Sequence, residues 1–290
     1  MSDRQSGPRV RVLSRVGLVG ACLAATVGAQ ALGAAPANAV PGLTRVVTTS
    51  ASNSANKTQS ATCPAGKVVV GGGGYVTGGV GQVGIDRSAP LSTGTGYSVT
   101  AREDGSGYAA NWSVTAIAFC APALVGLTFV TAATAPTSVA SRTVSASCTT
   151  GRSVIGVGAF ISDGNGEVIL DGMQPAADLR SVTASAYEDD SGYAGVWSLT
   201  AVAVCAAAPT GLQRVVATST STSTSPRSAT ATCPAGKSAH GAGFELTGAL
   251  GQVRPDDVNA TATAVTATGY EDDNGFVGNW SVAAYVVCAN

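Results

Sequence analysis

Three acidic loops contain the side chains best suited to chemistry in this chain. Each loop holds a Glu followed by one or two Asp, then a Gly and an aromatic residue, and each precedes a Trp. Carboxylates accept hydrogen bonds from hydroxyl groups, and a neighbouring aromatic ring can pack on the apolar face of a sugar. The loops therefore predict ligand contacts by Glu103, Asp104 and Tyr108, by Glu188, Asp189, Asp190 and Tyr193, and by Glu271, Asp272, Asp273 and Phe276.

The same loops have two other interpretations. An acidic hairpin turn that contains Gly and folds its aromatic residue onto the sheet is common and needs no ligand. Oxygen-rich loops also bind Ca²⁺, but the spacing typical of EF-hand calcium loops is not met. We therefore assign no metal-binding residues, and a structural turn and calcium binding both remain alternatives to ligand contact.

The loops belong to a unit that occurs three times. Gly42, Gly126 and Gly211 begin three similar segments, spaced by 84 and 85 residues. This fixed period predicts three tandem repeats, which we call copy 1 (42–125), copy 2 (126–210) and copy 3 (211–290).

Each copy contains two cysteines at matching positions. Six cysteines allow 15 pairings on paper, and one disulfide within each copy is favoured because all copies would then be closed in the same way. The expected pairs are Cys63 with Cys120, Cys148 with Cys205, and Cys233 with Cys288.

Alternating residues predict strands throughout the copies. In 112–120 the Trp and the Cys share one face, while the other face becomes apolar towards its end, so this strand needs a covering layer on both sides. Glycines at alternate positions of the strand 68–77 predict close approach by another backbone or an aromatic ring. No segment keeps a helical period. We therefore predict an all-β fold of three disulfide-closed antiparallel β-sandwich repeats around a pseudo-threefold axis.

Catalytic candidates are sparse. One Asp recurs in each copy, within a segment expected to end near it, where it would accept backbone N–H bonds of the next turn. The single His240 stands where the other copies have Val and Ile, so any Ser-His-Asp site would exist in copy 3 alone. We predict neither an enzyme nor a cofactor, with a secreted hydrolase as the second alternative. The recurring residues are Asp86, Asp171 and Asp256.

The first 39 residues have the pattern of an export signal. Four Arg in 1–15 precede an uncharged apolar stretch, which ends at Ala37-Asn38-Ala39. This pattern predicts a signal peptide over 1–39 with cleavage near Ala39, and hence an extracellular protein. A transmembrane anchor and lipid attachment at Cys22 are the alternatives.

Composition excludes several classes. The 290-residue chain is 45% hydrophobic and 11% charged, with a formal net charge of −1. A disordered chain would carry more charge, and a nucleic-acid binder would be basic. Beyond residue 39 no apolar run is long enough to span a membrane. We expect a monomer with an internal pseudo-trimer and no nucleic-acid partner.

The recurring motifs C-P-A-G-K, V-x-G-x-G and W-S-[VL]-x-A-x-x-x-C resemble repeats of secreted bacterial proteins and of some phage tail-fibre tips. The last 25 residues of each copy more distantly resemble the end of H-type lectin domains. That resemblance implies a trimer-like assembly and sugar binding near the boundaries between units. The leading hypothesis is a secreted surface-binding or adhesion protein with glycans or cell-surface polymers as partners, and the rival is a structural envelope or matrix protein.

Overall fold

The computed structural model describes residues 40–290; the predicted signal peptide lies outside that range. Residues 40–290 form 18 strands and no helix, in agreement with the predicted fold class. A membrane-spanning helix is accordingly not found in this part of the chain.

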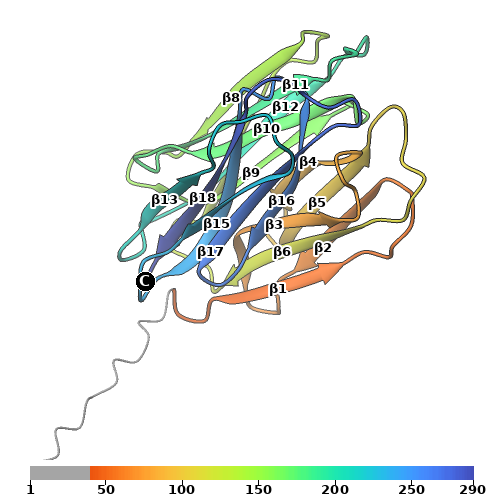
Figure 1. Cartoon of the computed structure of the whole chain (residues 1–290). Helices are drawn as coiled ribbons and strands as arrows, with labels where there is room; N and C mark the ends of the chain where they lie inside the picture. The colour runs from red at the N-terminus through yellow and green to blue at the C-terminus, as the bar shows by residue number, and fades with distance from the viewer. Residues whose placement is uncertain (1–39) are drawn as a thin grey trace, which may run out of the picture. The chain divides into compact units, whose positions relative to one another are not determined.

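Each copy contributes six strands in the same order (Figure 1). Copy 1 has β1 (Thr44–Thr49), β2 (Lys57–Thr62), β3 (Val68–Thr77), β4 (Val83–Pro90), β5 (Gly96–Glu103) and β6 (Ser113–Ala121). Copy 2 has β7 (Thr128–Ala133), β8 (Ser141–Ser147), β9 (Ser153–Ser162), β10 (Val168–Pro175), β11 (Ser181–Glu188) and β12 (Ser198–Ala206). Copy 3 has β13 (Gln213–Thr218), β14 (Arg227–Thr232), β15 (Ser238–Thr247), β16 (Val253–Ala260), β17 (Ala264–Glu271) and β18 (Ser281–Ala289).

Within a copy, the six strands form two antiparallel layers of three. In copy 1 these layers are β1-β6-β3 and β2-β5-β4, and the other copies repeat the order. One disulfide closes each copy, and all three predicted pairs are confirmed, with Cα–Cα distances of 5.6 to 5.7 Å. Disulfides of this kind are typical of proteins from oxidising compartments.

The copies join where a layer of one continues into a layer of the next. β4 pairs with β9 at seam 1–2, β10 with β15 at seam 2–3, and β3 with β16 at seam 3–1. The described chain thus forms three six-stranded sheets, and every sheet is shared by two copies. This cyclic sharing closes the three copies into a pseudo-threefold ring.

Glycines allow three strands to meet at the centre of the ring. A Cβ atom on Gly71 would lie 2.1 Å from the carbonyl oxygen of His240, and one on Gly156 would lie 2.1 Å from that of Val70. A Cβ atom on Gly241 would lie 2.8 Å from the Cα atom of Gly156. The prediction that these positions accept another backbone is confirmed, because any larger residue would collide with main-chain atoms.

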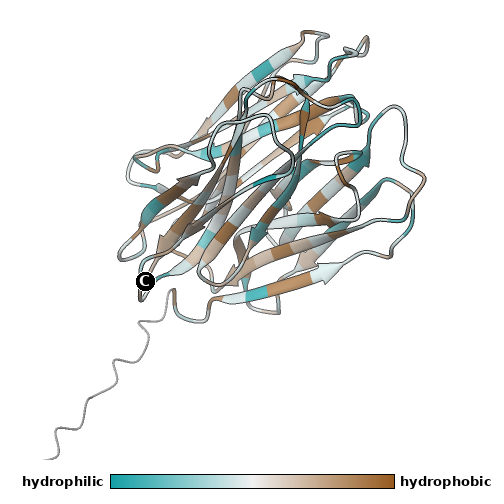
Figure 2. Ribbon diagram, in the orientation of Figure 1, coloured by the Kyte–Doolittle hydropathy of each residue, from teal (hydrophilic) through white to brown (hydrophobic). Residues whose placement is uncertain are grey.

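The core continues across the copies. The last strand of each copy is buried on both faces, as the sequence predicted, with Ile117 and Phe119 of β6 at most 1% exposed. Phe119 packs in one cluster with side chains of copies 2 and 3. Figure 2 shows the corresponding hydrophobic bands along the strands. Neighbouring copies therefore supply the second covering layer.

One predicted boundary is wrong. The segment expected to end near Asp86 continues to Pro90, and Asp86 lies inside β4 at a β-bulge opposite β5. Asp171 and Asp256 occupy the same bulge in their copies. All three side chains are largely buried, and burial raises the pKa of their carboxyl groups to about 6, 7 and 8 in chain order. A bulge inserts one residue without breaking the strand, so an alternation pattern misses it.

Candidate functional site

The Glu of each acidic loop forms hydrogen bonds within its own copy. In copy 2, the Oε1 atom of Glu188 accepts a hydrogen bond of 2.9 Å from the indole nitrogen of Trp197. Its Oε2 atom accepts one of 3.2 Å from the backbone N–H of Tyr193. Glu103 and Glu271 make the same two bonds in copies 1 and 3. Both carboxylate oxygens are therefore engaged within the loop.

A cation covers each of the three Trp rings. The Nζ atom of Lys57 lies 3.2 Å from the ring centroid of Trp112. The guanidinium groups of Arg142 and Arg227 lie 4.7 and 5.8 Å from the equivalent rings in copies 2 and 3. The Trp side chains themselves are fully buried. Each loop is thus anchored by an acid, an indole and a cation in contact.

The aromatic residues of the loops fold back onto the protein. A Cβ atom on Gly195 would lie 2.3 Å from the ring of Tyr193, and one on Gly278 would lie 2.3 Å from the ring of Phe276. Both rings, like that of Tyr108, pack against the core. The Tyr193 hydroxyl also accepts a hydrogen bond of 2.7 Å from the side-chain amide of Asn165. The aromatic rings of the loops therefore pack against the protein itself.

The Asp residues of the three loops meet in one depression. It has a volume of about 270 Å³, and its lining also includes Glu167 and Arg254. The Asn274 amide donates a 2.8 Å hydrogen bond to Asp190, which ties the loops of copies 3 and 2 together. The structure therefore combines the predicted loops into one acidic surface, called the loop depression below, whose acidic lining residues are Asp104, Asp189, Asp190, Asp272, Asp273 and Glu167.

Glycines of neighbouring copies let a turn of one copy pack closely against the acidic loop of another. Gly81, Gly166 and Gly251 each have a positive φ, between 84° and 89°. A Cβ atom on any of them would lie 2.0 to 2.1 Å from the carbonyl oxygen of a loop Glu in the preceding copy of the ring. Each loop is consequently held by the turn of another copy.

The electrostatics of the loop depression are mixed. Burial, followed by the nearby Asp190 carboxylate, raises the pKa of Asp272 to about 6, although Arg254 acts in the opposite direction. Burial and then the neighbouring Asp189 carboxyl raise the pKa of Glu167. The guanidinium of Arg254, only 4% exposed, lies 3.9 Å from Asp189 and donates to the Gly166 carbonyl oxygen. The buried cation partly neutralises the acidic lining.

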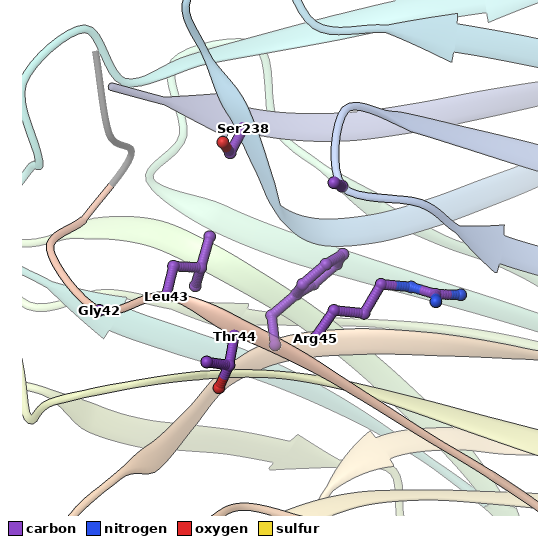
Figure 3. A pocket seen from close by; sticks show the side chains of 7 residues that line it. Gly42, Leu43, Thr44, Arg45 and Ser238 are labelled. Carbon is purple, nitrogen blue, oxygen red and sulfur yellow. The ribbon is translucent and has the colours of Figure 1, made fainter. Parts of the chain in front are cut away.

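The seams between copies show a second kind of site, at the boundaries where the lectin resemblance implied sugar binding, but formed by residues that the sequence did not indicate. At seam 3–1, the Nε atom of Arg45 on β1 donates a 2.7 Å hydrogen bond to the carbonyl oxygen of Ala260 on β16. Figure 3 shows the small pocket beside it, with Leu43 and Arg45 on the orange segment of copy 1 and Ser238 on the blue copy 3. At seam 2–3, Arg214 donates in the same way to the carbonyl oxygen of Pro175, at 2.9 Å.

Seam 1–2 has a Phe in place of this arginine. Phe129 occupies the position of Arg45 and Arg214 in the strand registers. Its ring reaches copy 1, where a Cβ atom on Gly94 would lie 3.1 Å away. Beside it is a cleft of about 490 Å³, called the seam cleft below, which is lined by Arg87, Pro90, Leu91, Ser92, Phe129, Thr131, Phe160 and Val202.

A cation and an aromatic ring form one wall of the seam cleft. Arg87 of β4 and Phe160 of β9 are directly opposite each other in the seam ladder, and the guanidinium lies 4.4 Å from the ring centroid. The equivalent pairs are Gly172 with Glu245 at seam 2–3 and Asp257 with Tyr75 at seam 3–1. The three seams therefore differ in their side chains although their strands pair in the same way.

The sequence does show that the copies differ in residue type at the positions that line the seam cleft. Positions 45, 129 and 214 read Arg, Phe and Arg, and positions 87, 172 and 257 read Arg, Gly and Asp. These positions vary between the copies, and only the topology shows that they meet. Small-molecule sites are commonly concave, largely apolar and lined by a few polar groups, as the seam cleft is.

Comparison with known proteins gives no further guide: no protein-family model matches the chain, and no curated protein is significantly similar to it in sequence. In residues 40–290, no group of three or more His, Cys, Asp or Glu side chains is arranged to hold a metal ion. The resemblances noted in the sequence, and the ligand contacts predicted for the loops, stay predictions.

Proposed function

We propose that this protein is a secreted, non-enzymatic binding protein that holds a glycan segment of a cell-surface polymer in the seam cleft. The observation that carries the proposal is the presence of Phe129 at the position where the other two seams have an arginine that donates a hydrogen bond across the seam. Beside Phe129 lies the seam cleft, with a volume of about 490 Å³. The apolar C–H face of a sugar ring can pack on Phe129, while its hydroxyls bond to Arg87, Ser92 or Thr131.

The lining of the seam cleft supports binding rather than catalysis. Its side chains are one guanidinium, two hydroxyls and apolar groups, without a carboxylate or imidazole among the described residues that line it. General acid–base hydrolysis of a glycosidic bond ordinarily needs a pair of carboxyl groups. Export, which the N-terminal pattern predicts, would bring the protein to surface polymers.

A glycan array with three forms of the protein tests the proposal. The variant Arg87→Asp/Phe129→Arg/Phe160→Tyr rebuilds seam 1–2 with the residues of seam 3–1, a combination that the fold already accommodates. We expect the wild type to bind and this seam-swap variant to lose binding with an unchanged circular dichroism spectrum.

The matched control is Asp190→Asn/Asp273→Asn, which removes two exposed carboxylates of the loop depression. We expect this variant to bind like the wild type. Loss of binding in the control but not in the seam-swap variant would move the site to the loop depression. Absence of binding by every form would favour the structural envelope or matrix role.

A further inference from the structure

We propose that the glycan held in the seam cleft is acidic, and that a uronic acid carboxylate pairs with the Arg87 guanidinium while the sugar ring packs on Phe129. This inference rests on the proposed function and names the ligand class of the same site. The geometry of Arg87 carries it, because Arg87 lines the seam cleft and its side-chain donors have no partner among residues 40–290.

Arg87 differs from the other arginines of the seams. Arg45 and Arg214 each donate to a carbonyl oxygen across their seam. The side chain of Arg87 makes neither a hydrogen bond nor an ion pair with any residue in 40–290, and its guanidinium stacks on the face of Phe160 at 4.4 Å. Stacking on a ring face leaves the five N–H donors in the guanidinium plane without acceptors.

The surroundings make these donors available to an anion. Arg87 is half-buried, and burial lowers the pKa of its guanidinium without removing the charge at neutral pH. The nearest acid in the chain, Asp86, is engaged by Arg102, whose Nε atom lies 2.5 Å from its Oδ2 atom. The adjacent carboxylate therefore already has its own cation.

A carboxylate on a sugar ring fits this arrangement better than a hydroxyl. The planar fork of a guanidinium matches the two oxygens of a carboxylate, and such charge-assisted bonds are roughly twice as strong as neutral ones. The apolar wall of Phe129, Pro90 and Leu91 suits the C–H face of the same ring. A uronic acid combines both features in one residue.

Calorimetric titration with matched sugars tests the inference. The probes are tetrasaccharides of glucuronic, galacturonic and mannuronic acid, each beside its neutral counterpart with every carboxylate reduced to a primary alcohol. We expect at least one acidic probe to bind about 10- to 100-fold more tightly than its neutral counterpart, the range typical of charge-assisted hydrogen bonds. Arg87→Gln should remove this preference and leave the weaker neutral binding.

Two further variants complete the test. Arg87→Lys keeps the charge without the planar fork and should give an intermediate preference. Arg180→Gln removes an exposed arginine elsewhere and should have no effect. Equal binding of acidic and neutral probes, lost in the seam-swap variant, would overturn the acidic ligand and keep the proposed function. Absence of any seam-dependent sugar binding would overturn both.

Discussion

The bond between Glu188 and Trp197 should stabilise copy 2 through an indole N–H that is fully buried. Glu188→Ala removes the acceptor of this N–H and of the Tyr193 backbone N–H. Leaving a buried donor without an acceptor costs about 1–3 kcal/mol, and bonds to charged groups lie at the upper end. We expect a loss of roughly 2–3 kcal/mol, which lowers the melting temperature by about 4–12 °C in a domain of this size.

Differential scanning calorimetry with the disulfides intact measures this change. The matched control is Asp273→Ala, which removes an exposed carboxylate from the acidic loop of copy 3 and should change stability by less than about 0.5 kcal/mol. Because the same bonds recur, Glu103→Ala and Glu271→Ala should give similar losses. Equal melting temperatures for Glu188→Ala and Asp273→Ala would refute the anchoring role of the loop Glu.

Three further changes test the interior. His240 is fully buried with its Nε2 atom unpaired, and burial lowers the pKa of its imidazole. The unfolded chain therefore takes up the proton more readily, and the stability of the fold decreases below pH 6.5. His240→Val should remove this decrease in melting curves recorded from pH 5 to 8. Burial, followed by the Asp257 carboxylate, raises the pKa of Asp256 to about 8. The protonated carboxyl therefore contributes its full stabilisation of the fold below pH 3.8, and this contribution is lost as the pH rises through 8. Asp256→Asn should accordingly stabilise the protein more at pH 9 than at pH 5, as measured by melting temperature. Replacing Cys148 and Cys205 by Ala opens a loop of 57 residues and should cost roughly 4 kcal/mol in urea unfolding; a loss below about 1 kcal/mol would contradict this account.

The strands and disulfides could be predicted because they follow local patterns. The alternation that ends in Cys120 repeats in all three copies, and β3 begins and ends where the sequence indicated. The glycines of this strand also indicated close backbone approach, which the contact of Gly71 with the His240 carbonyl confirms. These features depend on residues of one strand or on spacing shared by all copies.

The roles of the loop residues were harder to predict. The carboxylate of Glu103 suggested a ligand contact, yet it bonds to the indole of Trp112, nine residues along the chain. The same nine-residue spacing holds in all three copies and could have indicated a structural pair. The alternation of the strands says nothing about the turn between them, so this pattern alone did not indicate the direction of the carboxylate.

The seam cleft could not be predicted because it depends on which strands of different copies pair. Arg87 and Phe160 are 73 positions apart and meet through the single ladder between β4 and β9. Nothing in either segment alone indicates this partner. A sandwich with separate, unshared sheets would have satisfied the same alternation patterns.

Cyclic sharing of the sheets makes the position of the chain ends nearly arbitrary. The link 122–127 between copies 1 and 2, and the link 207–212 between copies 2 and 3, occupy equivalent places in the ring. A short linker of the same kind from Asn290 to Gly42 would create a third link. Circular permutants that begin at Gly126 or Gly211 would then retain every strand pair and every disulfide. New termini, and any fused domain, could therefore be placed at any of the three junctions without opening a sheet.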